Sequence, residues 1–78
     1  MPRGLRIPRD PRLPGKIGHE IRELRCRQCL TQDQLGEKTG FVGGPAIAAY
    51  EQGRTCPSVE ALIAIAGALG VGVADLLP

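Results

Sequence analysis

Apolar residues recur at helical spacing along most of the chain. Ile17, Ile21 and Leu24, for example, fall four and three positions apart, on one face of a helix. The apolar face of a later helix is expected to consist of Val59, Leu62, Ile63, Ala66 and Leu69. Helices are predicted over residues 16–28, 32–39, 45–52, 58–69 and 73–77. No segment alternates as a strand does, so the pattern predicts an all-α protein.

Capping and breaking residues lie where these helices should begin and end. Thr31 and Gln34 form a capping box, in which the hydroxyl and the amide each bond the other residue's backbone N–H. Pro45 suits the first turn of a helix, Ser58 is a favoured N-cap, and Gly40 is a favoured helix stop. Short helices joined by tight, glycine-marked turns predict a five-helix orthogonal bundle.

Residues 1–15 form a basic, proline-rich arm. Residues 1–16 hold five basic residues and one acidic residue, a net charge of +4, whereas residues 17–78 hold five basic and seven acidic residues, a net charge of −2. The density of proline argues against a helix, so we expect a disordered or extended arm. Such an arm either binds nucleic acid or is a solvated tail. The predicted domains are this flexible arm, 1–15, and a folded domain, 16–78.

Composition excludes several classes of protein. The three cysteines are an odd number, no signal peptide precedes them, and the longest uncharged stretch, 61–74, is too short to span a bilayer. We therefore expect a soluble protein of a reducing cytoplasm. The single histidine, His19, has no nucleophile or carboxylate grouped with it, so we predict no enzyme activity, no cofactor and no metal.

Residues 17–77 resemble the phage-repressor helix-turn-helix family (Cro-like, xenobiotic-response-element type). The stretches that carry the resemblance are IGHEIRELRCRQCLTQDQLGEKTG, IAAYEQG and RTCPSVEALIAIAGALGVGVADLL. The resemblance implies a lambda-repressor-like DNA-binding domain that binds double-stranded DNA as a homodimer, with the helix over 45–52 in the major groove. It also implies phosphate contacts by Thr31 and Gln32, and an internal ion pair between Arg25 and Glu51.

The predicted recognition helix departs from the family pattern. Its DNA-facing positions are Gly43, Gly44, Pro45, Ala46 and Ala49. None of them carries a polar side chain that donates to a base edge, so we expect weak sequence specificity and affinity that depends on phosphate contacts. Further phosphate or minor-groove contacts are predicted for Arg54 and, in the arm, for Arg3, Arg6, Arg9 and Arg12.

Three alternatives remain open from the sequence. The dimer surface is predicted at Val71, Val73, Leu76 and Leu77, although some of these must also complete the core. The apolar recognition helix equally fits a protein-interaction module, or an antitoxin that binds a protein partner. Cys26-x-x-Cys29 with Cys56 and His19 supplies four zinc-type ligands, but a single close pair is weak support for zinc; a redox role is a further alternative.

Overall fold

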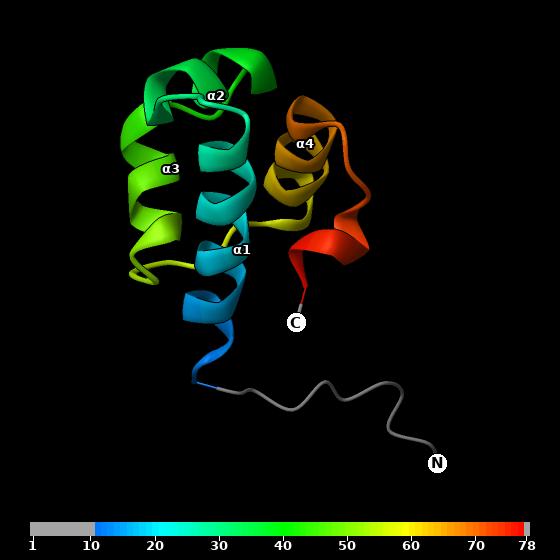
Figure 1. Cartoon of the computed structure of the whole chain (residues 1–78). Coiled ribbons are helices and arrows are strands. Elements are labelled where there is room, and N and C mark those ends of the chain that lie inside the picture. Colours follow the sequence, from blue (N-terminus) through cyan, green and yellow to red (C-terminus); the bar gives the residue numbers. More distant parts are fainter. Residues whose placement is uncertain (1–10, 78) are drawn as a thin grey trace.

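The computed structural model describes residues 11–77, and in them every regular element is helical (Figure 1). The elements are α1 (Leu13–Arg27), α2 (Gln32–Thr39), α3 (Gly44–Glu51), α4 (Val59–Leu69) and the 3-10 turn η1 (Val73–Leu76). α1 lies between α3 and α4, and α2 crosses the end of this layer. The all-helical prediction is confirmed, but the described part has four α-helices rather than five, because the last predicted helix is a four-residue 3-10 turn.

The first helix begins earlier than the sequence predicts. α1 starts at Leu13 rather than near residue 16, and Pro14 lies in its first turn. A proline there is tolerated because the N–H it lacks would have no partner within the helix. The expectation that proline excludes helix throughout residues 1–15 was therefore wrong for residues 13–15.

The predicted caps of the later helices are present. The Thr31 hydroxyl accepts from the Gln34 N–H at 3.0 Å, and the Thr31 N–H donates to the Gln34 amide oxygen at 2.8 Å, which completes the capping box of α2. Ser58 caps α4 by accepting from the Ala61 N–H at 3.1 Å. These bonds satisfy backbone donors that each helix start leaves free, and they fix where α2 and α4 begin.

Each of the four α-helices in residues 11–77 is followed, at its C-terminal end, by a residue in the left-handed conformation. In α2, α3 and α4 it is a glycine, whereas in α1 it is Cys29, with φ of 57°. The Cys29 N–H donates to the Cys26 carbonyl at 3.0 Å and the Leu30 N–H donates to the Arg25 carbonyl at 3.1 Å, the bond pair of a Schellman motif. α1 thus ends as the other helices do, but with a side chain where glycine is preferred.

The substitution Cys29→Gly is expected to stabilise the protein. Glycine adopts the left-handed conformation without the Cβ clash that costs other residues about 1–2 kcal/mol, and its greater unfolded-state freedom offsets part of the gain, leaving about 1 kcal/mol. Denaturant unfolding under reducing conditions measures the difference. Cys29→Ala is the matched control, since it removes the thiol but keeps the Cβ. Equal stabilities for the two variants would contradict the proposed strain.

A single apolar core fills the space between the helices. Its fully buried large side chains are Ile17, Ile21, Leu35, Ile47, Ile65 and Leu76. The predicted α4 face was wrong in part: Val59 is 71% exposed and Ile63 is 57% exposed, whereas Ala61 and Ile65 are buried. α4 is apolar around most of its circumference, so hydrophobic spacing alone fits two different faces.

Candidate nucleic-acid interface

α2 and α3 are joined by a tight turn over residues 40–43. Thr39 organises this turn, because its hydroxyl donates to the Gly36 carbonyl at 2.6 Å and accepts from the Val42 N–H at 2.9 Å. A Cβ on Gly36 would lie 2.7 Å from the Val42 carbonyl oxygen, so the turn backbone packs directly on α2. This close packing sets the position of α3 relative to α2.

Arg25 and Glu51 join α1 to the end of α3. Arg25 Nε lies 2.6 Å from Glu51 Oε2, and Arg25 Nη2 lies 2.9 Å from Glu51 Oε1, so the guanidinium group and the carboxylate form two parallel bonds. Arg25 Nη1 also donates to the Leu30 carbonyl at 2.7 Å, in the connection to α2. The side chains are only 13% and 4% exposed, respectively. The structure thus brings together the two residues that the resemblance paired, and adds a bond to the backbone.

The contact with Glu51 stabilises the charged form of Arg25. The hydrogen bonding of the Arg25 guanidinium group to Glu51 raises the pKa of Arg25, partial burial opposes the shift, and the Coulombic attraction of Glu51 adds to it. A raised pKa on a base contributes stability that is complete below the usual arginine pKa and is lost only as pH rises through the folded-state value. Arg25 therefore stays charged across the neutral range, and its contribution does not vary there.

Gln32 lies in the same network rather than free at the surface. Its Nε2 donates to Glu51 Oε1 at 3.2 Å. The half-buried Gln32 amide therefore serves first to attach α2 to α3. The neighbouring Thr31 is exposed at the N-terminus of α2, where backbone N–H groups and the helix dipole favour an anion. Phosphate contact by Thr31 stays a prediction, and the structure gives Gln32 a positioning contact.

α3 presents a small and nearly uncharged outer surface. Gly43 and Pro45 are exposed, and Ala46 and Ala49 are half-buried. Gly44 differs from its prediction because it is buried. A Cβ on Gly44 would collide with the Asp33 carboxylate and lie 3.0 Å from its Cγ, so Asp33 covers this position. Gly44 therefore allows α2 and α3 to lie close together. The accessible positions at the start of α3 are the flanking residues Gly43 and Pro45.

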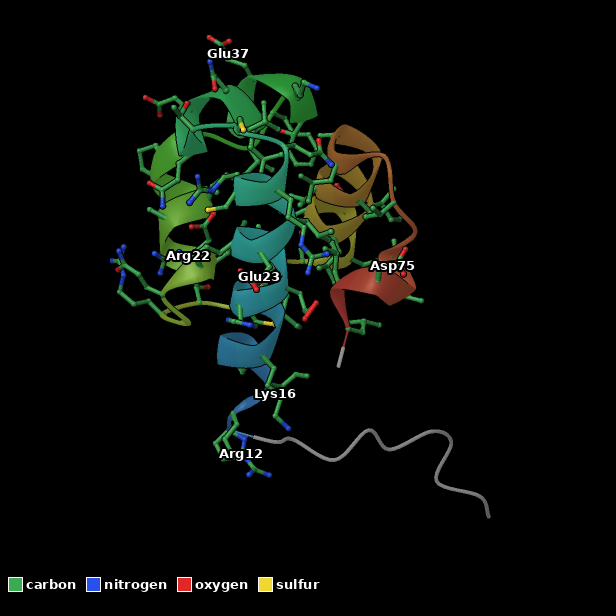
Figure 2. All side chains as sticks on the ribbon, in the orientation of Figure 1. Arg12, Lys16, Arg22, Glu23, Glu37 and Asp75 are labelled. Atoms are coloured by element: carbon green, nitrogen blue, oxygen red, sulfur yellow. The ribbon has the colours of Figure 1, made fainter. Side chains whose placement is uncertain are left out.

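An open hollow beside this helix start is acidic. It is lined by Asp33, Gly36, Glu37, Gly40, Phe41, Val42, Gly43 and Gly44. Glu37 projects outward from α2, at the end of the molecule opposite Arg12 (Figure 2). The two carboxylates oppose the attraction of the α3 N-terminus for phosphate. This hollow is therefore an unfavourable place for a phosphate group, and Asp33, in the first turn of α2, also lowers the attraction of that helix start for an anion.

Basic residues gather near the other end of α3. Arg54 is exposed directly after that helix, and its Nε donates to Gln52 Oε1 at 2.7 Å. A Cβ on Gly53 would lie 3.1 Å from the Gly15 Cα, so the start of α1 packs against this segment. Arg12 is the exposed N-cap residue of α1, one turn before Gly15. The predicted arm contacts Arg3, Arg6 and Arg9 lie outside the described residues.

The predicted dimer residues differ in how far they are exposed. Leu76 is fully buried against the core, so it cannot contribute to a surface between two copies, and this part of the prediction was wrong. Val71 and Val73 are partly buried and pack on the core, while Leu77 is 44% exposed. The C-terminal turn thus first closes the core of one chain. The sequence interpretation assigned Val59 and Ile63 to the apolar face of α4, but both are exposed, four residues apart on that helix.

Two other features of residues 11–77 bear on function. No three histidine, cysteine or acidic side chains in them are grouped as metal ligands. None of the helices described is long and apolar enough to cross a bilayer.

The geometry of α2 and α3 agrees with comparisons to known proteins. The profile of the helix-turn-helix family matches residues 21–76, which is most of the chain. The chain belongs to the helix-turn-helix family. It is 38% identical over 61 residues to the immunity repressor protein of Bacillus phage phi105, and this match covers 78% of the chain and 42% of the repressor. The chain therefore spans less than half the length of that curated relative.

Two solved structures share the fold of this chain. The restriction-modification controller protein C.AhdI from Aeromonas hydrophila has a TM-score of 0.78 at 26% identity, covering 82% of this chain and 96% of that one. The P22 c2 repressor, solved in complex with a synthetic operator, has a TM-score of 0.72 at 33% identity, covering 78% of this chain and 91% of that one. Each likeness covers about four-fifths of this chain.

Proposed function

We propose that this helix-turn-helix protein is a transcriptional regulator, acting as a repressor, that binds double-stranded DNA as a homodimer. The observation that carries the proposal is the α2–α3 pair, which the Gln32–Glu51 bond joins and the Arg25–Glu51 bonds attach to α1. The α3 surface of this pair is accessible at Pro45, Ala46 and Ala49. The similarity to a repressor solved on its operator supports the same use of this pair. Two symmetric half-sites would lie about 34 Å apart, or a multiple of that distance.

The chemistry of the surface determines how the DNA would be held. Methyl groups of Ala46 and Ala49 offer only apolar contact, which suits a thymine methyl but does not distinguish the other base edges. Phosphate contacts by the N-terminus of α2 and by Arg54 would supply most of the affinity. Binding should therefore be tolerant of sequence and should weaken steeply as salt increases.

A salt titration with the variant Arg54→Ala tests this assignment. Loss of one phosphate contact should weaken binding to all duplexes alike, and should reduce the slope of log affinity against log salt by about 1. Fluorescence anisotropy with a labelled random duplex measures both quantities. Lys38→Ala removes the same charge from the last turn of α2 and is the control. An equal change in both variants would show that only net charge matters.

A second candidate function rests on the same apolar surface of α3. Because the accessible α3 positions carry no polar side chain, the surface also fits a protein-interaction module or an antitoxin. Selection from a random duplex library separates the candidates. Enrichment of a palindrome supports the repressor, whereas absence of binding to any duplex at low salt supports the interaction module.

A further inference from the structure

The turn that ends α1 holds two thiols in a defined arrangement. Cys26 lies in the last turn of the helix and Cys29 is the left-handed residue after its C-cap. The bond from the Cys29 N–H to the Cys26 carbonyl, 3.0 Å long, closes the four-residue turn between them. The second bond, from the Leu30 N–H to the Arg25 carbonyl, encloses this turn, so its backbone is fixed at both ends.

This backbone brings the two residues within the reach of a disulfide. Residues at the ends of a hydrogen-bonded four-residue turn have Cα atoms less than about 7 Å apart, and most disulfides span Cα separations of about 4.4–6.8 Å. Both residues are exposed free thiols. An oxidant in solution therefore has access to both, and their backbone separation is one that disulfides span.

The arrangement of the two cysteines suits a disulfide rather than a metal site with more ligands. Cys56, the third cysteine, lies in the connection between α3 and α4. Within residues 11–77 no third histidine, cysteine or carboxylate joins the pair as a metal ligand. A structural zinc site needs four ligands, whereas a disulfide needs only these two.

We propose that Cys26 and Cys29 are a redox-active dithiol that closes reversibly to an intramolecular disulfide. With a small-molecule disulfide as oxidant, one thiolate attacks a sulfur of that disulfide and releases a thiol, and the second thiolate then displaces the other half as a second thiol. One S–S bond forms, one breaks, and the two cysteines lose two electrons and two protons in all. A thiol reductant reverses both steps.

Closing this disulfide would act on the connection from α1 to α2. The same connection is held by Arg25, whose guanidinium group donates to the Leu30 carbonyl. Gln28, between the two cysteines, donates from Nε2 to the Leu69 carbonyl of α4 at 2.7 Å. A crosslink across this turn restricts the unfolded chain while matching a turn that the folded chain already forms. The disulfide is therefore expected to stabilise the fold, independently of any DNA binding.

Equilibration of the full chain with reduced and oxidised glutathione tests the proposal. The variant Cys56→Ser serves as the parent, since it keeps only the pair. After alkylation of free thiols, mass spectrometry should find an unalkylated chain that is lighter by two hydrogen atoms than the reduced, unalkylated parent. Digestion should yield two peptides linked through residues 26 and 29. In Cys26→Ser/Cys56→Ser and in Cys29→Ser/Cys56→Ser, the remaining thiol should instead carry one glutathione. A parent that carries only glutathione adducts, or only disulfides between chains, would overturn the proposal.

Thermal unfolding supplies a second measurement on the same samples. The oxidised parent should melt on the order of 5–10 °C above the reduced parent, and reductant should restore the lower value. The single-thiol variants should show no such increase. A lower melting temperature on oxidation would mean that the disulfide distorts the turn, and would also overturn the inference that this turn is preformed for it.

Discussion

Gly18→Ala is expected to destabilise the fold by about 3 kcal/mol. Gly18 lies in α1 where that helix meets the end of α3. A Cβ at this position would overlap the Tyr50 carbonyl oxygen and lie 2.9 Å from the Glu51 Cα. Both are backbone atoms, so no rotation of a side chain relieves the overlap. α1 and α3 would have to separate, and the Arg25–Glu51 bonds would be strained at the same time.

The size of this effect is best judged against total stability. A domain of this length is expected to unfold with a free energy of roughly 4–12 kcal/mol. Loss of about 3 kcal/mol would therefore remove a large share of it, and would populate the unfolded state under mild conditions. Urea unfolding followed by circular dichroism measures the change. An intermediate with separated helices would also broaden the transition.

Gly15→Ala is the matched control in the same helix. A Cβ on Gly15 meets nothing within 4 Å, so alanine fits there without contact. Alanine is also favoured over glycine within a helix by about 0.5–1 kcal/mol. The two substitutions, identical in chemistry, should thus change stability in opposite directions. If Gly18→Ala were as stable as Gly15→Ala, the close approach of α1 and α3 would be disproved.

Local signals in the sequence predicted much of the fold. The Thr31–Gln34 capping box, the Ser58 cap and the glycine stops are properties of a few neighbouring residues, and the structure contains them. The spacing of Ile17 and Ile21 identified the buried face of α1 for the same reason. Such features depend on backbone geometry within one or two turns, which is why they are readable without knowledge of the tertiary fold.

Features that depend on packing between distant segments were not predictable in this way. Leu76 is apolar wherever it lies, and only the fold shows that it closes the core. The sequence alone does not distinguish Gly18 and Gly44 from the exposed Gly15 and Gly43. In the fold, however, Gly18 and Gly44 lie against another helix, and Gly15 and Gly43 do not. The position of Gln32 beside Glu51 likewise needs α2 and α3 in place. The candidate interface was therefore predictable as a region, but not residue by residue.

Replacing one residue of the Arg25–Glu51 pair is expected to lower the free energy of unfolding more than replacing both. Arg25→Met would leave the Glu51 carboxylate, 4% exposed, with only the Gln32 amide as a described side-chain partner. An orphaned buried charge of this kind costs about 3–5 kcal/mol. Arg22→Met, on the exposed face of α1, is the control and should change stability by less than about 0.5 kcal/mol.

A double-mutant cycle decides whether the two charges act together. Glu51→Met alone leaves Arg25 with the Leu30 carbonyl but no carboxylate, and should also be strongly destabilised. Arg25→Met/Glu51→Met removes both charges and places two apolar side chains in the same space, so it should be more stable than either single variant. Two independent surface charges would give additive losses instead. Because the pair joins α1, the α2 connection and α3, a positive coupling would mean that the two charges hold these segments together as a unit. Under the proposed function, the double variant should fold yet bind duplex DNA more weakly than the parent, because α3 loses this attachment to α1.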